Sequence, residues 1–220
     1  MQTTLSTTQI QQMNEWGRTR TPFLFMLDFE GNKPILLPLN QAANEGISFV
    51  VDTPFFQQNN VSIPSNSRLQ NAPFSISQPI PFTKYQQAFA LVHHHLSKGD
   101  SFLLNLTAST PIVLSMTLQE IFFAAKAKCK VLFKDEFTCF SPEPFVLINK
   151  KGIISSYPMK GTAIQHSAED KERLLSNQKE LFEHTTIVDL IRNDLSKIAF
   201  PIRVEKYQYI ERVKTNTGEL

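Results

Sequence analysis

Residues 145–162 decide the expected fold of this chain and read Phe-Val-Leu-Ile-Asn-Lys-Lys-Gly-Ile-Ile-Ser-Ser-Tyr-Pro-Met-Lys-Gly-Thr. Two short apolar runs, 145–148 and 153–157, flank the polar tetrad 149–152, whose last residue is glycine. A polar turn of this kind between two apolar runs is typical of an antiparallel β-hairpin. The stretch therefore predicts a hairpin that ends in the motif Pro-Met-Lys-Gly-Thr.

The register of this hairpin can be estimated from its turn. If Ile148 faces Ile153, the pairing brings Glu143 opposite Pro158, and Lys160 then points from the same face as Glu143. Prolines near both ends of the hairpin have no N–H group to donate to the pairing between the strands. A three-residue turn would shift the pairing by one residue and place Glu143 and Lys160 on opposite faces. The four-residue turn predicts that a carboxylate and an amine share one surface.

The next segment predicts a long helix. Residues 170–199 contain neither glycine nor proline, and Ser167 with Asp170 resembles a capping box at the start. We therefore expect one continuous helix over this range.

Two carboxylates and an imidazole share one face of the expected helix, because Glu180, Glu183 and His184 stand at i, i+3 and i+4. From spacing alone, the simpler interpretation is a solvated face with Lys179 nearby. The alternative is a Mg²⁺ site, since Mg²⁺ often takes only one or two carboxylates and keeps several waters.

The remainder of the chain predicts mixed strands and helices. A strand-rich N-terminal part, 1–80, would precede a second region, 81–220, although a single intertwined domain is possible. Trp16 would dock a polar N-terminal helix onto the body. The expected elements are a hairpin of 23–29 with 35–37, a helix over 83–97 capped by Thr83 and ended by Gly99, a strand over 101–108 and a helix over 117–130.

The amino-acid composition of the chain argues against several classes of protein. The 220 residues are 41% hydrophobic and 19% charged, which favours a globular chain, and a net charge of +2 gives no warrant for nucleic-acid binding. The two cysteines form no CxxC pair, which fits a reducing compartment. With no secretory signal pattern and no membrane-length apolar run, we expect a cytoplasmic protein without a membrane partner.

Three motifs stand in order along the chain: Ser-Pro-Glu-Pro-Phe at 141–145, Tyr-Pro-Met-Lys-Gly-Thr at 157–162 and Lys-Glu-Leu-Phe-Glu-His at 179–184 running on to 195. Together, and with support from 99–107 and 22–29, they resemble the chorismate-utilising enzymes, a family that includes anthranilate, isochorismate and salicylate synthases and aminodeoxychorismate synthase component I. The resemblance implies an α/β (α+β) fold with large, mainly antiparallel sheets packed face to face, helices outside and the active site in the cleft between the sheets.

Lys160 is the discriminating position, because anthranilate synthases typically carry a small residue there and aminodeoxychorismate synthases a lysine. The resemblance implies that Lys160 attacks C2 of chorismate, that the C4 hydroxyl leaves, and that ammonia adds at C4 as the lysine is expelled. Such covalent catalysis requires an uncharged amine. Glu143 would be the general acid for the departing hydroxyl, which requires a protonated carboxyl.

The resemblance also assigns binding roles. Gly161 and Thr162 would hold a substrate carboxylate through a backbone N–H and a hydroxyl, and Glu183 would ligate Mg²⁺, with Glu180 supporting it directly or through water. Here the resemblance favours a metal site over a solvated helix face. Ammonia would come from a glutamine amidotransferase subunit.

The same resemblance leads us to expect a C-terminally incomplete chain. Family members continue past the stretch matching 204–220 with a second acidic cluster, a Thr-Gly-Ala-Pro-Lys segment and an Arg/Tyr pair that this sequence lacks. Two functions of different class are therefore open. One is aminodeoxychorismate synthase component I, which makes 4-amino-4-deoxychorismate for folate, with anthranilate or isochorismate synthase as alternatives among enzymes. The other is an inactive truncated fragment or scaffold that at most binds a partner.

Overall fold

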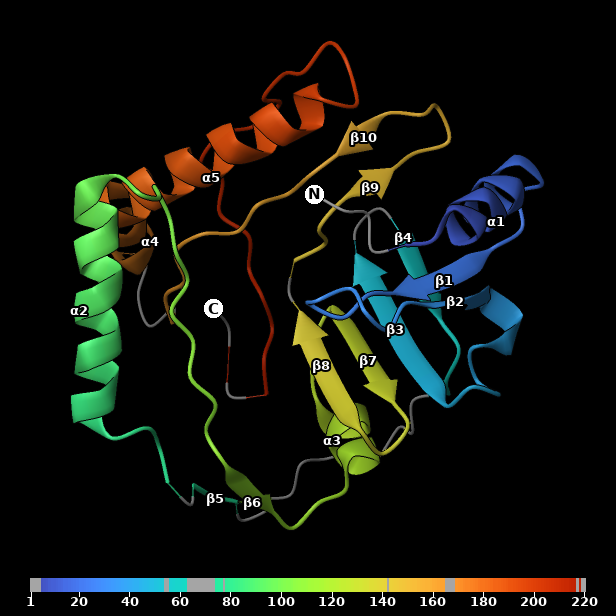
Figure 1. The fold of residues 1–220 in the computed structure, drawn as a ribbon, viewed down its shortest axis with the longest axis horizontal. Helices are drawn as coiled ribbons and strands as arrows, with labels where there is room; N and C mark the ends of the chain where they lie inside the picture. Colours follow the sequence, from blue (N-terminus) through green and yellow to red (C-terminus); the bar gives the residue numbers. More distant parts are fainter. Residues whose placement is uncertain are drawn as a thin grey trace. The chain divides into compact units, whose positions relative to one another are not determined.

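The computed structural model describes residues 5–53, 56–62, 74–76, 78–141, 143–164, 169–216 and 218. The chain forms two compact units, one of Met1–Ser67 with Leu118–Leu220 and one of Arg68–Thr117 (Figure 1). All strand pairings in the described part of the chain are antiparallel. The mixed α/β class with antiparallel sheets is therefore confirmed, whereas the expected boundary near residue 80 stays a prediction.

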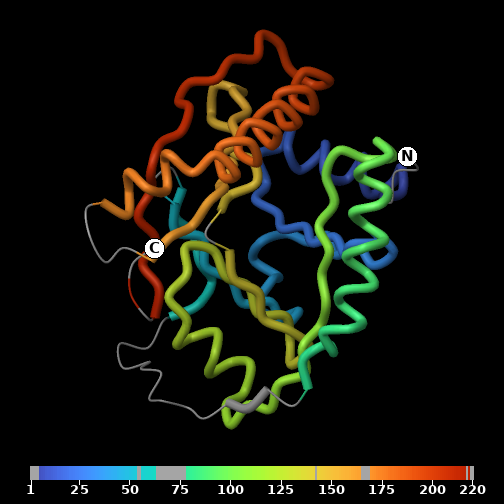
Figure 2. The backbone as a smooth tube through the Cα atoms, turned by 90° about the vertical axis from the view of Figure 1, so that its left-hand side faces the viewer, coloured from blue at the N-terminus to red at the C-terminus, as the bar shows by residue number. Residues whose placement is uncertain are grey.

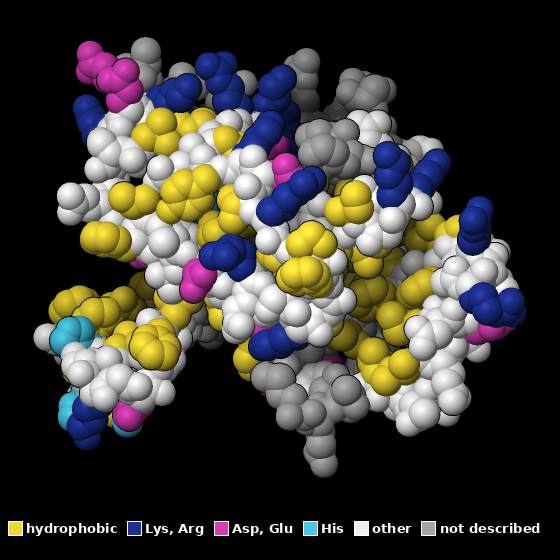
Figure 3. All heavy atoms as spheres, turned by 90° about the horizontal axis from the view of Figure 1, so that it is seen from above, with side chains coloured by type: hydrophobic (Ala, Val, Ile, Leu, Met, Phe, Trp, Pro, Cys, Tyr) yellow, Lys and Arg dark blue, Asp and Glu magenta, His cyan; other side chains and the backbone are white. Residues whose placement is uncertain are grey.

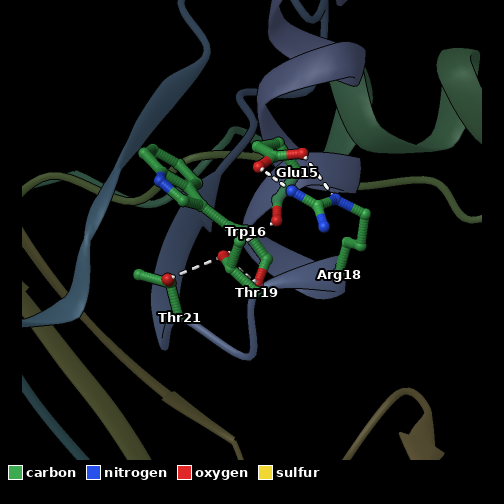
Figure 4. Close-up of polar contacts among 5 residues, drawn as sticks. All are labelled: Glu15, Trp16, Arg18, Thr19 and Thr21. Carbon is green, nitrogen blue, oxygen red and sulfur yellow. Dashed lines mark hydrogen bonds and ion pairs between the residues drawn. The ribbon is translucent and has the colours of Figure 1, made fainter.

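The larger unit begins with α1 (Thr7–Arg18), and Trp16 on this helix contacts Phe23 with ring centroids 5.4 Å apart. The helix ends at Thr19, whose hydroxyl lies 2.9 Å from that of Thr21 (Figure 4). The aromatic contact ties α1 to the strand that follows it, as expected for Trp16.

A four-stranded sheet forms the centre of the larger unit, in the order β4 (Phe56–Asn59), β3 (Ile47–Thr53), β7 (Cys129–Phe133) and β8 (Phe137–Ser141). A separate hairpin pairs β1 (Phe23–Met26) with β2 (Ile35–Pro38), as predicted, and a 3₁₀ turn, η1 (Leu39–Gln41), follows it. Strands far apart in the sequence thus meet in one sheet, because β3 pairs with β7.

Both faces of this sheet are covered by apolar side chains, because successive residues of a strand point to opposite faces. Ile47 and Phe49 of β3 belong to a cluster with Leu37 of β2, whereas Val50 belongs to a second cluster. That second cluster contains Phe122 of α3 (Leu118–Ala124), which is fully buried. Helix α3 therefore anchors one side of the sheet (Figure 1).

Helix α3 is shorter than the predicted helix over 117–130, because Cys129–Phe133 joins the sheet as β7. The buried Lys130 of β7 donates hydrogen bonds from Nζ to the carbonyl oxygens of Phe122, at 2.7 Å, and Ala125, at 3.0 Å. The ammonium also lies 4.8 Å from the centroid of the Phe122 ring. Burial lowers the pKa of Lys130, and its hydrogen bonds satisfy carbonyl groups at the end of the helix.

The predicted hairpin forms from β9 (Leu147–Ile148) and β10 (Ile154–Ser155), but the predicted register is wrong by one residue. Ile148 pairs with Ile154 in place of Ile153. The physical reason is Asn149, whose side-chain oxygen accepts hydrogen bonds from the N–H groups of Lys151 and Ile153. These bonds draw one more residue into the turn, so the parity of the faces is reversed.

The predicted helix over 170–199 is two helices, α4 (Glu169–Ser176) and α5 (Gln178–Ser196). Asn177 interrupts it with an extended backbone, and its side-chain oxygen accepts a hydrogen bond from the N–H of Glu180 at 3.3 Å. Asparagine at such a position is a strong helix start signal. The expected cap Ser167 lies outside the described residues.

The smaller unit contains α2 (Phe82–Lys98) and a ladder between β5 (Phe74–Ile76) and β6 (Ile112–Leu114). Gly99 ends the helix with φ +78°, as predicted, whereas Thr83 lies inside the first turn and Pro81 occupies the cap position.

The expected strand over 101–108 is wrong, because no strand of the described chain pairs with it. An extended segment needs a partner for its backbone groups to form a sheet. Most of its apolar side chains are open to solvent, with Phe102 95% exposed. Exposed apolar side chains also occur on other elements, and Figure 3 shows many on one face (yellow).

Within the described residues, no helix combines the length and apolar character needed to cross a membrane.

Replacing Lys130 by methionine tests the buried ammonium. Lys130→Met keeps most of the side-chain stem but leaves the carbonyl groups of Phe122 and Ala125 without their donor. We expect the free energy of unfolding to fall by about 1–3 kcal/mol in urea titrations. Lys150→Met, at an exposed position in the β9–β10 turn, is the control and should change it by less than about 0.5 kcal/mol. Equal stability of the two variants would contradict a structural role for Lys130.

Candidate active site

The Glu143 backbone is held at the end of β8 by Ser141. The Ser141 hydroxyl donates to the carbonyl oxygen of Glu143 at 3.0 Å and accepts from its N–H at 3.2 Å. The Glu143 residue is half-buried. A short polar turn therefore fixes where the segment carrying this carboxylate starts.

Lys160 lies on the segment that leaves β10, and it is exposed. The β9–β10 ladder ends at the pair of Leu147 with Ser155, and one further hydrogen bond joins the Ser156 hydroxyl to the carbonyl of Phe145 at 2.8 Å. Because the ladder ends before either residue, the corrected register does not decide whether Glu143 and Lys160 share a face. The hairpin joins the two segments, and no hydrogen bond or ion pair between the two side chains is found among the described residues.

Gly161 joins the lysine segment to α5. Its φ is +74°, and a Cβ atom built there would lie 3.1 Å from Oε2 of Glu180 and 3.2 Å from Cδ1 of Leu174. Glycine suits this position for two reasons. It tolerates a positive φ, and because it has no side chain it lets the backbone approach a carboxylate. In Figure 1 the chain runs from β10 toward α4 beside α5. The structure thus brings the predicted substrate-binding Gly161 together with the predicted metal ligand Glu180, and Thr162 follows at the surface.

The two carboxylates of α5 converge on one ammonium. Lys179 Nζ lies 3.5 Å from Oε1 of Glu183 and 4.0 Å from Oε1 of Glu180. The glutamate side chains are 37% and 26% exposed, whereas that of Lys179 is 75% exposed. Such contacts are those of a solvated helix face with Lys179 nearby, the simpler of the two interpretations of the spacing.

This donor set fits Mg²⁺, because both side chains offer only oxygen and Mg²⁺ keeps several waters. In the described part of the chain, no group of three or more His, Cys, Asp and Glu side chains is gathered around a common point. A metal ion at Glu180 and Glu183 would therefore complete its coordination with oxygen atoms of water or substrate.

Tyr207 is a contact of α5 that the sequence reasoning missed. Its ring lies 5.3 Å from that of His184, and its hydroxyl lies 2.6 Å from that of Thr185. Figure 2 follows the chain (red) as it leaves α5 and turns back. No motif around Tyr207 predicts this contact, because it depends on how the chain turns after the helix.

The segment after Tyr207 continues to the sheet. Burial raises the pKa of Tyr209, and the negative charges of Glu211 and of an ionised Tyr157 add to this shift. Glu211 pairs with Lys128 just before β7, and Asn216 bridges the N–H of Lys126 and the carbonyl of Ala124 at 2.7 and 2.9 Å. Residues 207–216 thus link α5 to the region between α3 and β7.

Comparison with known proteins assigns the chain to a family. The family of chorismate binding enzymes matches residues 37–216. This chain belongs to that family. No solved structure matches it.

The relatives of this chain differ in how specifically their names describe a function. An "Uncharacterized PabA-like protein" of Haemophilus influenzae is 43% identical over 96% of this chain and 62% of its own length, and one of Pasteurella multocida is 42% identical over 96% and 63%. "Aminodeoxychorismate synthase component 1" of Bacillus subtilis is 28% identical over 64% of this chain and 34% of its own length. The chain thus spans less than two thirds of the length of these relatives.

Gly161→Ala tests the close approach of the lysine segment to α5. The new methyl group would lie close to Glu180 and Leu174, and the alanine backbone would also have to adopt a positive φ. We therefore expect the free energy of unfolding to fall by about 1–3 kcal/mol. The matched control is Gly152→Ala, since Gly152 also has positive φ, +77°, but nothing lies within 4 Å of the added atom. Chemical denaturation should show the larger loss for Gly161→Ala. Equal losses of unfolding free energy in the two variants would indicate that the contacts with Glu180 and Leu174 add nothing to the cost of the positive φ.

Asn177→Ala tests the start of α5. Loss of the bond to the Glu180 N–H should lower the free energy of unfolding by about 0.5–2 kcal/mol. The control is Asn193→Ala at an exposed position inside α5, where alanine favours the helix. If urea titrations show no loss for Asn177→Ala, the cap does not stabilise α5.

Proposed function

We propose that this chain is the part of an aminodeoxychorismate synthase component I that carries the attacking lysine, and that it acts in the amination of chorismate at C4. The observation that carries the proposal is the contact between Gly161 and Glu180, because it joins the lysine motif to the carboxylate pair. The lysine at position 160 and the relatives named aminodeoxychorismate synthase, including a "Putative aminodeoxychorismate synthase" of Schizosaccharomyces pombe, 30% identical over 80% of this chain, support the choice of reaction.

In the proposed reaction, the uncharged Lys160 amine forms a bond to C2 of chorismate as the bond from C4 to its hydroxyl breaks. Glu143 gives its proton to the departing oxygen, which leaves as water. Ammonia then forms a bond to C4 while the bond from C2 to the Lys160 nitrogen breaks, so the lysine is regenerated. The proton that the new C4 ammonium group gives up restores the Glu143 carboxyl. The products are 4-amino-4-deoxychorismate and water. The exposed position of Lys160 leaves its amine accessible to a substrate.

The binding residues would surround the substrate from two elements. The N–H of Gly161 and the hydroxyl of Thr162 would hold one carboxylate, with glycine allowing close approach. Glu183, with Glu180 beside it, would hold Mg²⁺, which when bound supplies positive charge for the ring carboxylate of chorismate. Both glutamates lie on α5, whose first turn packs against Gly161.

The proposal extends to the cellular role. Ammonia would come from a glutamine amidotransferase partner, and the product would enter folate synthesis in the cytoplasm. The second candidate function is an inactive fragment or scaffold. It is favoured by one observation, that Glu180 and Glu183 already pair with Lys179, as carboxylates on a helix face without a metal ion do.

The purified 220-residue chain, supplied with chorismate, Mg²⁺ and ammonium, separates these functions. We expect a product that keeps the enolpyruvyl ether and gains an amine at C4, identified by mass spectrometry and NMR. Anthranilate or isochorismate would instead assign the chain to those alternatives. If no product forms while the chain remains folded, the second candidate is favoured.

Lys160→Met tests the nucleophile. Because methionine has no amine, we expect amination to fall by about a hundredfold or more, without loss of the folded state. The control Lys150→Met removes an equal charge from the β9–β10 turn and should keep full activity. Activity of Lys160→Met equal to that of the control would remove the lysine from the mechanism.

A further inference from the structure

We propose that Lys179 is a built-in counter-ion of Glu180 and Glu183, which holds the place of the divalent cation in the metal-free protein and weakens binding of that cation. The inference rests on the metal site of the proposed function and concerns how strongly that site holds its ion.

The ammonium is the positive group found beside both carboxylates. Lys179 Nζ is 3.5 Å from one Oε1 atom and 4.0 Å from the other, and both distances join it to the Oε1 side of the glutamates. The two carboxylates are part-buried, so their mutual repulsion is less screened than that of fully exposed groups. The ammonium between them offsets this repulsion.

The two oxygen atoms of Glu180 have different neighbours. Oε2 lies 3.1 Å from the position that a Cβ atom at Gly161 would occupy, whereas Oε1 lies 4.0 Å from Nζ of Lys179. Glu183 also presents its Oε1 atom to the ammonium, at 3.5 Å. A metal ion held by the two Oε1 atoms would therefore bind beside the ammonium.

A divalent cation and the ammonium compete for these atoms. Mg²⁺ binds oxygen at about 2.0–2.1 Å, and Oε1 of Glu183 lies 3.5 Å from Nζ, so an ion on that oxygen would lie within about 6 Å of the ammonium. Two positive groups at such a separation repel each other. The Lys179 side chain is 75% exposed and flexible, so it can swing into solvent when the ion binds. The competition should be of moderate size, because exposed ion pairs are individually weak.

Binding of Mn²⁺, an oxygen-preferring probe for a Mg²⁺ site, tests this competition without any assay of activity. Free Mn²⁺ is measured by electron paramagnetic resonance during titration of the 220-residue chain. We expect Lys179→Gln to lower the Kd for Mn²⁺ by about threefold to tenfold. Lys179→Arg, which keeps the charge, and Lys150→Gln, which removes a distant turn charge, should stay within about twofold of the original chain. An unchanged or higher Kd for Lys179→Gln would overturn the proposal.

Glu183→Gln separates failure of this inference from failure of the metal site itself. If Glu183→Gln weakens Mn²⁺ binding but Lys179→Gln does not strengthen it, only the counter-ion role is wrong. If Glu183→Gln leaves binding unchanged, or no variant binds Mn²⁺, the metal site of the proposed function is wrong and the counter-ion role is overturned with it.

Thermal unfolding gives a second readout. Without metal, Lys179→Gln should have a lower Tm than Lys150→Gln, because its carboxylates lose their counter-ion. Added Mn²⁺ should raise the Tm of Lys179→Gln more than that of the control. Equal Tm values in both conditions would overturn the proposal.

Discussion

The candidate site depends on the absence of a side chain at Gly161. With φ at +74° and side-chain atoms of Glu180 and Leu174 within 3.4 Å of where a Cβ atom would lie, this residue lets the backbone after β10 approach the first turn of α5. Any larger residue would have to adopt a strained φ and displace those side chains. The lysine before Gly161 and the carboxylates of α5 therefore belong to one local structure.

Several helices and strands could be predicted from the sequence because their signals are local. The helix over 82–98 follows from apolar periodicity and a terminal glycine, and the β1–β2 hairpin from two apolar runs around a turn. The face shared by Glu180 and Glu183 follows from helical geometry alone. Family membership was expected from the joint motifs and is confirmed by the match over 37–216.

Other features could not be predicted because they depend on single side-chain hydrogen bonds or on distant partners. Asn149 lengthens the β9–β10 turn and Asn177 divides the predicted helix, and both act through one amide side chain. The predicted helix over 117–130 ran into the first two residues of β7, which pair with the distant strand β3 instead. For the site, spacing placed Glu180 and Glu183 on one helix face and the family resemblance gave them a metal-binding role, whereas Tyr207 reaches α5 only through the turn of the chain after that helix.

The segment from Tyr207 to Asn216 connects two distant parts of the larger unit and affects the stability of both. At one end, Tyr207 contacts α5. At the other, Asn216 forms hydrogen bonds with backbone groups of the loop between α3 and β7. Once one end is fixed, the other has only a short loop of about ten residues to close, so its docking costs little additional entropy. Order at the carboxylate helix and order at the edge of the sheet are therefore thermodynamically coupled, and loosening either attachment makes the other less favourable.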